Sequence, residues 1–458
     1  MRTGIEKKYI YRWFCVVVLT AFTGASFYYV WVRFVKVHNQ TGNLMGLGNR
    51  LMAVGICCVL YLFLGKALKA FRIGIDRKAN LLASEAMTLF SLNALEILIS
   101  CAITGQFRFF PDFLWRYALL FLVQATVTCV AIYYMVDLYR HIFPPYEILE
   151  IYKSADDRKL HFMNDRPDKY HIADVVCIDE GLDRIFEIMD SYDAVLINDI
   201  PSEIKNDILK ECFNRDKRVY FTPKISDIIS KKSEDINLFD TPLYLCRNAG
   251  LQPIQLIVKR IFDCLISIVG LVVLSPVFLV VALAIRAEDH GPVFYRQRRV
   301  TIGGREFEML KFRSMVVDAE KDGRPRPAGE DDDRITKVGH RIRPVRIDEL
   351  PQLINILKGD MSIVGPRPER VEHVAMYTEE IPEFVYRLKV KGGLTGPAQV
   401  FGRYNTDALN KLKMDLFYIT NYSILLDLQI LFETVKILVQ KESTAGFSEE
   451  KREEIHDA

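Results

Sequence analysis

Two adjacent carboxylates, Asp348 and Glu349, stand where a chain could carry out phosphate chemistry. Pro351 suits the first turn of a helix and Gly359 suits its end, so a short helix should follow the acidic pair. The free N–H groups and the dipole at a helix N-terminus favour an ionised carboxylate and attract phosphate. An ionised, fixed aspartate can act as a nucleophile in phosphoryl transfer. For an isolated Asp-Glu-Leu-Pro, an ordinary acidic helix cap would be the better interpretation.

Cationic residues elsewhere in the sequence favour the chemical interpretation. Arg367 lies between two prolines, which fix the backbone and lower the cost of orienting its guanidinium toward phosphate. Lys311 and Arg313 alternate in a strand-like run, so both side chains are expected on one face. Together with Asp348 and Glu349 they predict an anion site, with Mg²⁺ bridging carboxylate and phosphate oxygens.

A run of three aspartates, Asp331 to Asp333, offers an alternative metal site. Such a cluster could hold the metal of a nucleotide-sugar glycosyltransferase, which releases a nucleoside diphosphate. It follows Arg-Pro-Ala-Gly-Glu, however, a composition typical of a solvated loop. A surface loop is therefore the favoured interpretation.

The elements that must position these residues begin with an unusual apolar segment. Residues 264–285 carry no charge and are long enough to cross a bilayer as one helix. Basic residues flank both ends, Lys259 and Arg260 among them, so a spanning helix would place one basic cluster outside, against the positive-inside rule. A second feature of the segment, its middle, also argues against a simple span.

Ser275 and Pro276 fall at the centre of this segment. Proline removes a backbone donor and clashes with the preceding turn, so it kinks a helix. The serine hydroxyl can cover a freed carbonyl that lipid could not satisfy. The sequence therefore predicts a re-entrant helix over 261–286 that dips into one leaflet and returns.

Four earlier stretches, 13–32, 47–65, 86–104 and 117–136, are long and apolar enough to span a membrane. They predict a four-helix transmembrane domain over residues 1–140. Basic residues are concentrated before the first span and between the second and third, which places the N-terminus in the cytoplasm. After four crossings, the remainder of the chain is predicted to be cytoplasmic.

Residues 145–248 contain short apolar runs that alternate with helical patterns, which predicts a small Rossmann-like α/β domain with a parallel sheet. The first run continues as Ile151-Tyr-Lys-Ser-Ala-Asp-Asp, without the glycines that let a backbone approach a pyrophosphate. The pattern argues against nucleotide binding and favours a structural, oligomerising or regulatory domain. Residues 250–445 hold the chemistry-bearing motifs, and 446–458 form a polar tail.

Composition agrees with a membrane α+β protein of several domains. The 458 residues are 50% hydrophobic and 26% charged, with a mean hydropathy of +0.09. A net charge of +2 argues against a dedicated nucleic-acid binder, so we expect no nucleic-acid partner. Nine cysteines without a CxxC pair suggest free thiols in a reducing compartment.

The motifs and their order resemble the bacterial sugar transferase family, the monotopic polyprenyl-phosphate phosphoglycosyltransferases. The resemblance covers about 255–440. Its motifs are Lys259-Arg260, Ser275-Pro276, Gly-Pro-Val-Phe-Tyr-Arg-Gln, Lys-Phe-Arg-Ser-Met, Asp-Glu-Leu-Pro-Gln, Leu-Lys-Gly-Asp-Met-Ser and Val-Gly-Pro-Arg-Pro. The complete chain is similar to the large members that initiate exopolysaccharide, capsule or O-antigen synthesis.

The resemblance implies a two-step reaction in which Asp348 attacks the β-phosphate of a UDP-sugar and releases UMP. Undecaprenyl phosphate then takes the phosphosugar, with glucose or galactose 1-phosphate the expected group. By motif position, Asp348 is the nucleophile and a Mg²⁺ ligand, and Glu349 assists with the metal and the acceptor. The other residues assigned in this way are the phosphate-binding Lys311, Arg343 and Arg367, and Asp415, which supports the site.

The resemblance also implies a multi-pass protein of the bacterial cytoplasmic (inner) membrane, with its catalytic domain on the cytoplasmic face, and it is compatible with a homodimer. One motif departs from the family pattern, since Lys391-Gly392-Gly393 stands where members usually have Lys/Arg-Pro-Gly, and glycine loosens that turn. Two other functions stay open: a metal-dependent glycosyltransferase that releases UDP, and a non-catalytic membrane assembly protein.

Overall fold

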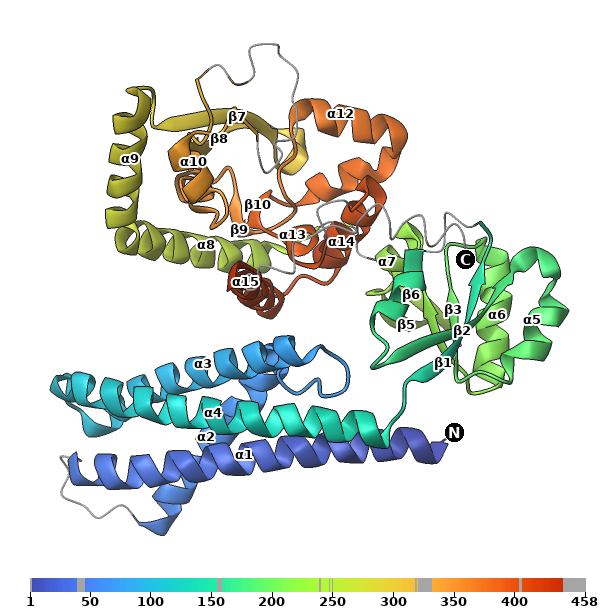
Figure 1. Ribbon diagram of the computed structural model, residues 1–458, viewed down its shortest axis with the longest axis horizontal. Helices are drawn as coiled ribbons and strands as arrows, with labels where there is room; N and C mark the ends of the chain where they lie inside the picture. Colours follow the sequence, from blue (N-terminus) through green and yellow to red (C-terminus); the bar gives the residue numbers. More distant parts are fainter. Residues whose placement is uncertain are drawn as a thin grey trace. The chain divides into compact units, whose positions relative to one another are not determined.

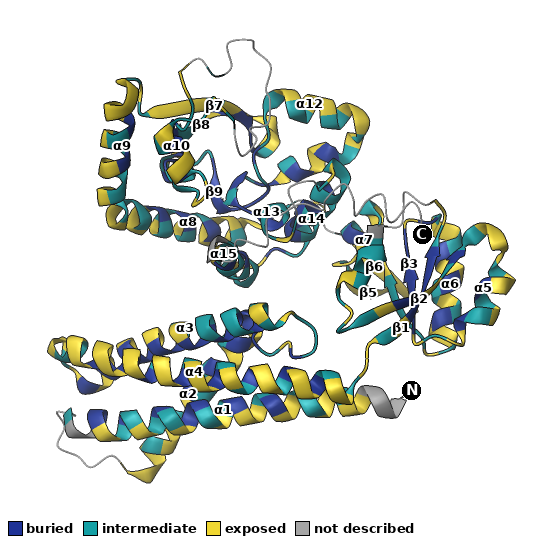
Figure 2. Ribbon diagram, viewed as in Figure 1, coloured by how far each residue is buried: buried dark blue, intermediate teal, exposed yellow. Residues whose placement is uncertain are grey.

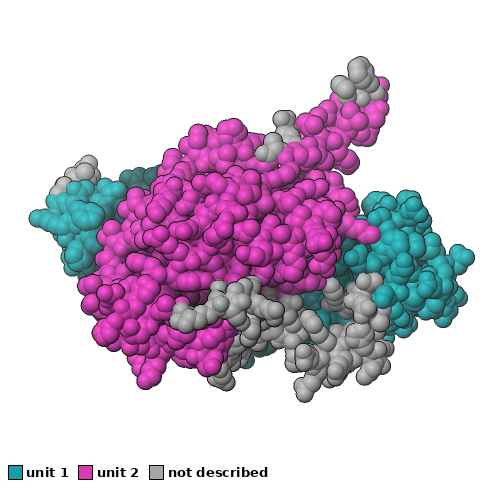
Figure 3. Space-filling view, turned by 90° about the horizontal axis from the view of Figure 1, so that it is seen from above, with its two compact units in different colours: residues 1–222, 449–458 teal, residues 223–448 magenta. Residues whose placement is uncertain are grey.

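The chain forms two compact units in the computed structural model, one built from the chain up to Thr222 and one beginning at Pro223 (Figure 3). The structure describes residues 2–38, 46–154, 159–238, 240–246, 248, 250–317, 319, 332–402 and 406–439. Asp331 and the predicted tail 446–458 lie outside the described residues.

The first unit begins with four long helices (Figure 1). They are α1 (Arg2–His38), α2 (Leu47–Ala67), α3 (Lys78–Thr104) and α4 (Phe110–Ile142). Each is long and apolar enough to cross a membrane, which confirms the prediction of four apolar helices. Many large apolar side chains on their outer faces are exposed, as lipid contact requires (Figure 2).

Polar side chains connect these helices from the inside. Tyr61 of α2 donates a hydrogen bond to Glu85 of α3 at 2.7 Å. Asn93 of α3 donates to Gln124 of α4 at 2.9 Å. Because lipid offers no partners, polar groups within such helices are satisfied between helices, and these bonds help to fix the packing.

A parallel four-stranded sheet follows, with the strand order β2-β1-β3-β4. Its strands are β1 (Tyr146–Tyr152), β2 (Tyr170–Cys177), β3 (Ala194–Ile197) and β4 (Arg218–Phe221), and its helices are α5 (Leu182–Met189) and α6 (Ser202–Asn214). Every residue of β3 is buried, because apolar clusters cover both faces of the sheet. The predicted α/β region with a parallel sheet is therefore confirmed.

Residues 243–245, the last short apolar run of the predicted 145–248 domain, do not join this sheet. They belong to β6 (Thr241–Leu245), which pairs antiparallel with β5 (Glu234–Leu238) in the second unit, after α7 (Ile225–Ser230). Asp240 adopts a φ of 60°, as tight hairpin turns often require, and the short connection therefore makes a hairpin rather than a crossover.

A bent pair of helices, α8 (Pro253–Val273) and α9 (Ser275–Asp289), starts the larger part of the second unit. Their axes differ by 61° at the break. The Ser275 hydroxyl donates to the carbonyl oxygen of Val272 at 2.8 Å, as expected of a serine that covers a freed carbonyl. The break falls at the predicted Ser-Pro, although the helices extend beyond 261–286.

The rest of this unit packs around the helix pair. Its strands are β7 (Phe294–Val300) and β8 (Glu306–Phe312), which are antiparallel, and β9 (Ser362–Val364) and β10 (Gly393–Thr395), which are parallel. Its helices are α10 (Lys337–Ile342), α11 (Gln352–Lys358), α12 (Val371–Glu380), α13 (Pro397–Phe401), α14 (Ala408–Thr420) and α15 (Ile424–Val439). One apolar core joins α11, α14, α15 and both parallel strands.

Candidate active site

Asp348 and Glu349 lie in a single 3₁₀ turn, Ile347–Glu349, just before α11. Arg346 precedes the turn with a φ of 54°, a conformation that costs a non-glycine residue energy and is common at functional sites. The predicted helix is present, with Pro351 before its first residue and Gly359 at its C-terminal cap. Because α11 has only 7 residues, the electrostatics of the pair must come mainly from side chains.

Glu349 is held by two cations. Its Oε1 accepts hydrogen bonds from Lys311 Nζ at 3.0 Å and from Arg367 Nη2 at 2.8 Å. Burial alone would raise the pKa of Glu349, but the positive charges of Arg367 and Lys311 outweigh it and hold this pKa far below its usual range. Glu349 is therefore an ionised anchor that brings two cations, distant in sequence, to one place.

Asp348 differs from its neighbour, because its side chain forms no ion pair with any residue that the structure describes. Burial raises the pKa of Asp348, opposed by the charges of Lys311 and Arg343 and supported by that of Glu349. A poorly solvated carboxylate that is not bound to a cation keeps its lone pairs available. Asp348 therefore has the properties of an attacking group.

Arg343 is the C-terminal cap of α10, and its positive charge lowers the pKa of Asp348. Its guanidinium forms no ion pair with any residue that the structure describes. The site thus combines one cation without an anionic partner with two that share Glu349. An incoming diphosphate would find these charges already in place, so little reorganisation is needed.

Arg313 requires a correction. It was expected to share a face with Lys311, but β8 ends at Phe312, and the Arg313 guanidinium binds Asp289 at the end of α9 instead. Its Nε also donates to the carbonyl oxygen of Pro292 at 2.7 Å. Side chains alternate between two faces only within a strand, so the pattern does not extend to Arg313, whose guanidinium pairs with the nearby carboxylate of Asp289. Arg313 therefore joins the helix pair to the strands and is not part of the Lys311–Glu349–Arg367 group.

Asp415 of α14 supports the site through an intermediary that the sequence analysis did not find. Its carboxylate is fully buried and lies 2.7 Å from Arg387 Nη2. The same nitrogen donates to the backbone oxygen of Arg367 at 2.9 Å. Burial raises the pKa of Asp415 to about 6, against the opposing charge of Arg387.

A second missed arginine, Arg299, holds the next carbonyl. It donates from Nη1 to the backbone oxygen of Pro368 at 3.0 Å and lies 3.9 Å from Glu369. Glu369 also lies 3.6 Å from Arg387. Neither arginine stands in a motif with recognisable spacing, but Glu369, directly after Arg-Pro, was a visible signal of a further ion pair.

The carboxylate pair also fits a magnesium ion. Among the described residues there is no group of three or more His, Cys, Asp or Glu side chains that could hold a metal. Mg²⁺ is commonly held by one or two carboxylates together with substrate phosphates and water. Asp348 and the second oxygen of Glu349 are such ligands, so the residues present are compatible with Mg²⁺ bound jointly with a diphosphate.

Helix α8 is anchored directly to the segment that follows the acidic turn. Arg260 donates from Nη2 to the backbone oxygen of Leu357, near the end of α11, at 2.7 Å. Lys259 is 6% exposed and binds Asp427 of α15 at 2.7 Å. The sequence identifies Lys259 as one of the basic residues that flank the apolar segment, and its partner on α15 explains how this charge can be buried.

Comparison with known proteins agrees with this geometry. Residues 254–441 match the model of a family described as bacterial sugar transferase. A Klebsiella pneumoniae protein named UDP-glucose:undecaprenyl-phosphate glucose-1-phosphate transferase is 38% identical over 265 residues, 56% of this chain and 54% of its own. An Aeromonas hydrophila protein, named UDP-N-acetylgalactosamine-undecaprenyl-phosphate N-acetylgalactosaminephosphotransferase, is 37% identical over 255 residues, 54% of this chain and 59% of its own.

A shorter relative is matched over most of its length. The exopolysaccharide production protein ExoY of Sinorhizobium fredii is 37% identical over 210 residues, 43% of this chain and 92% of that protein. The chain spans only about half the length of the Klebsiella and Aeromonas relatives. These matches show that the chain belongs to the bacterial sugar transferase family.

Proposed function

We propose that this protein transfers a sugar 1-phosphate from a UDP-sugar to undecaprenyl phosphate, releases UMP, and forms a covalent intermediate on Asp348. The observation that carries the proposal is the half-buried carboxylate of Asp348, which forms no ion pair with a described residue, beside Arg343 and the Lys311–Glu349–Arg367 group. The names of the relatives support the same donor and acceptor classes.

In the first step, an oxygen of Asp348 bonds to the β-phosphorus of the donor. The bond from that phosphorus to the bridging oxygen breaks, and UMP leaves with the electron pair. In the second step, an oxygen of undecaprenyl phosphate bonds to the same phosphorus, and the carboxylate of Asp348 leaves. The nucleophile is restored, and the product is a lipid diphosphate sugar.

The other residues act by charge and position. Arg343, Lys311 and Arg367 bind phosphate oxygens, and Glu349 keeps the last two in place. Asp348 and Glu349 would hold Mg²⁺, which supplies charge neutralisation on the diphosphate when bound. Asp415 and Arg387 orient the Arg367 backbone, so they are positioning residues.

The bent helix pair supports a location of this chemistry at the membrane. Exposed apolar side chains cover one face of α8, including Ile261 and Val272, whereas Asp263 and Ser267 are buried on the other. A helix with one apolar face and one protein-bound polar face suits a re-entrant hairpin better than a span. We propose that α8 and α9 enter and leave the cytoplasmic leaflet of the bacterial inner membrane. Homodimer formation remains a prediction.

The transferred sugar is proposed from the relatives. Three of them, from Klebsiella pneumoniae, Escherichia coli and Xanthomonas campestris, are named as UDP-glucose-dependent glucose-1-phosphate transferases. The Aeromonas relative is named for N-acetylgalactosamine. Glucose 1-phosphate is therefore the proposed group, in the first membrane step of exopolysaccharide, capsule or O-antigen synthesis. Galactose 1-phosphate, which the family resemblance also implies, is the second candidate.

The test uses the purified full-length protein in lipid nanodiscs with undecaprenyl phosphate, Mg²⁺ and a panel of UDP-sugars. UMP release supports the proposal, whereas UDP release would support a metal-dependent glycosyltransferase and overturn it. Asp348→Asn should abolish UMP release. Asp332→Asn is the matched control, because Asp332 binds Arg334 at 2.6 Å and belongs to the alternative cluster.

A further inference from the structure

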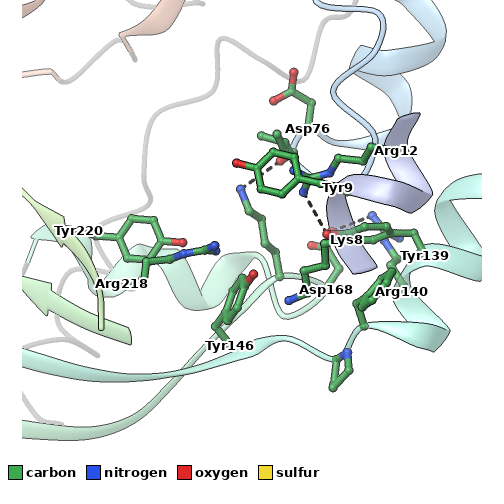
Figure 4. Close-up of a pocket in the computed structure, with 15 residues that line it drawn as sticks. Lys8, Tyr9, Arg12, Asp76, Tyr139, Arg140, Tyr146, Asp168, Arg218 and Tyr220 are labelled. Carbon is green, nitrogen blue, oxygen red and sulfur yellow. Dashed lines mark hydrogen bonds and ion pairs between the residues drawn. The ribbon is translucent and has the colours of Figure 1, made fainter. Parts of the chain in front are cut away.

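A cavity of about 180 Å³ lies within the first unit, where helix ends meet the α/β domain (Figure 4). The start of α1, the segment between α2 and α3, and the end of α4 form one side. Strands β1 and β4 and the turn before β2 complete it. Five of its side chains are cationic and two are carboxylates: Lys8, Arg12, Arg140, Lys169 and Arg218, with Asp76 and Asp168.

Four of the five cations contact only neutral groups. The Lys8 ammonium lies 3.7 Å from the centre of the Tyr146 ring, and the Arg218 guanidinium lies 4.3 Å from the same ring. Arg12 donates to the Ile73 carbonyl at 2.9 Å. Lys169 donates to the backbone oxygen of Ile75 at 3.4 Å. Within the described part of the chain, none of these four forms an ion pair with a carboxylate.

The carboxylates of the cavity are already engaged. Asp168 lies 2.7 Å from Arg140 and 2.9 Å from Arg166. Asp76 lies 3.7 Å from Arg72, outside the cavity lining. The four cations therefore leave an excess of positive charge in a half-buried space, offset only in part by Asp76, and such charge is costly.

The titration of Lys169 agrees with this geometry. Burial, followed by the like charge of Arg166, lowers the pKa of Lys169 to about 8. A bound anion would oppose both effects, since its negative charge favours the protonated form of Lys169.

We propose that this cavity binds the phosphate group of an anionic ligand, and that the phospholipid headgroup of the surrounding membrane supplies it. The cavity opens where the apolar spans Glu6–Val35 and Phe107–Ile142 begin and end, which is the level of lipid headgroups. Basic pockets at such ends bind anionic headgroups, and tyrosines such as Tyr9 and Tyr139 are typical of the interface. The site lies in a different unit from Asp348, so this inference is independent of the proposed reaction.

The variant that tests the site removes two cations without removing a backbone contact. Lys8→Gln with Arg218→Gln suits this purpose, because both side chains contact the Tyr146 ring and neither donates a hydrogen bond to a carbonyl of the residues that the structure describes. Arg184→Gln with Lys210→Gln is the matched control, since these exposed cations lie on α5 and α6. Lys8→Arg with Arg218→Lys keeps both charges and reports on folding.

The first arm measures phosphatidylglycerol retained by the full chain in native mass spectrometry, after purification from mixed phosphatidylglycerol and phosphatidylcholine vesicles. We expect about thirtyfold weaker retention in the glutamine pair, as two lost cations of about 1 kcal/mol each predict. The control pair and the charge-conserving pair should retain the lipid. The second arm titrates pyrophosphate into detergent-solubilised protein and follows thermal unfolding.

Each outcome either identifies the ligand that supplies the phosphate group, a lipid headgroup or a soluble molecule, or overturns the proposed site. Lipid loss confined to the glutamine pair supports the headgroup. Unchanged lipid retention, with pyrophosphate stabilising the wild type and the control but not the glutamine pair, keeps the phosphate site and assigns it to a soluble ligand. Equal behaviour of the wild type and the glutamine pair in both arms, or loss in the charge-conserving pair as well, overturns the proposal.

Discussion

The guanidinium of Arg387 lies between the buried carboxylate of Asp415 and the backbone oxygen of Arg367, at 2.7 and 2.9 Å. Through this contact a residue of α14 fixes the direction of a side chain that binds Glu349 at 2.8 Å. Arg387 and Asp415 are both buried, which restricts movement of this contact, and its disturbance should appear as poorer binding of phosphate.

Asp415→Asn keeps the volume of the side chain and removes its charge. We expect the KM for the UDP-sugar to rise by about tenfold, since Arg367 loses its fixed orientation and a charge-assisted contact of about 1.5–3 kcal/mol weakens. Initial rates over a range of donor concentrations measure this change. A purely structural role would reduce the fraction of active protein and leave KM unaltered. Arg298→Gln, on the exposed face of β7, is the control.

The pH dependence of the reaction should report on Asp348. The attacking carboxylate must be ionised, and burial raises its pKa, so kcat/KM should fall with decreasing pH at a higher pH than an ordinary aspartate would give. The charge of Arg343 lowers this pKa, so Arg343→Gln should shift the acidic limb to higher pH. Arg343→Lys keeps the charge and should leave the limb near its original position. A limb that is the same in all three proteins would rule out this electrostatic role.

The surroundings of Gly392 explain why glycine replaces the proline that family members usually have at this position. A Cβ atom there would lie 2.5 Å from Cγ of Pro368, and the Gly392 N–H donates to the Thr301 hydroxyl at 3.2 Å, a donor that proline lacks. Gly392→Ala should therefore displace Pro368, with a cost of about 1–3 kcal/mol for overpacking. The expected result is a lower thermal unfolding midpoint together with weaker donor binding.

The matched variant for this prediction is Gly46→Ala. A Cβ at Gly46 meets nothing within 4 Å, and its φ of −61° suits any residue. Its unfolding midpoint should equal that of the wild type. If Gly392→Ala also unfolds at the wild-type temperature and binds donor normally, the close contact with Pro368 has no consequence.

The bent pair α8 and α9 predicts that both of its ends lie on one side of the membrane. Gln252→Cys and His290→Cys, each exposed, should react with an impermeant maleimide only when the cytoplasmic face is open to it. The mass added relative to the parent protein measures the reaction. Labelling of the two positions from opposite sides would show a spanning helix.

Local patterns were enough to predict much of the fold. Long apolar stretches predicted the four apolar helices, and the Ser275-Pro276 pair predicted the break in the bent helix. Alternating short elements predicted the parallel sheet, because β2 and β3 are each followed by a nearby helix, α5 and α6. These features depend on residues that are close together in the sequence.

Contacts between distant segments were not predictable in the same way. Arg313 was assigned by alternation, but its partner Asp289 comes from the end of another helix. Arg387 approaches Arg367 and Asp415 only after three segments have packed together. Adjacency and residue type identified Asp348 and Glu349 as a pair. Their opposite pKa shifts depend on the packed structure, because Lys311 and Arg367 bind Glu349 and not Asp348.

The most direct measurement is mass spectrometry of the protein after incubation with UDP-glucose and Mg²⁺ in the absence of undecaprenyl phosphate. The account predicts UMP in the supernatant and one phosphohexose on the peptide that contains Asp348, removed again when the lipid acceptor is added. No adduct on that peptide, together with full UMP-releasing turnover by Asp348→Asn, would contradict it.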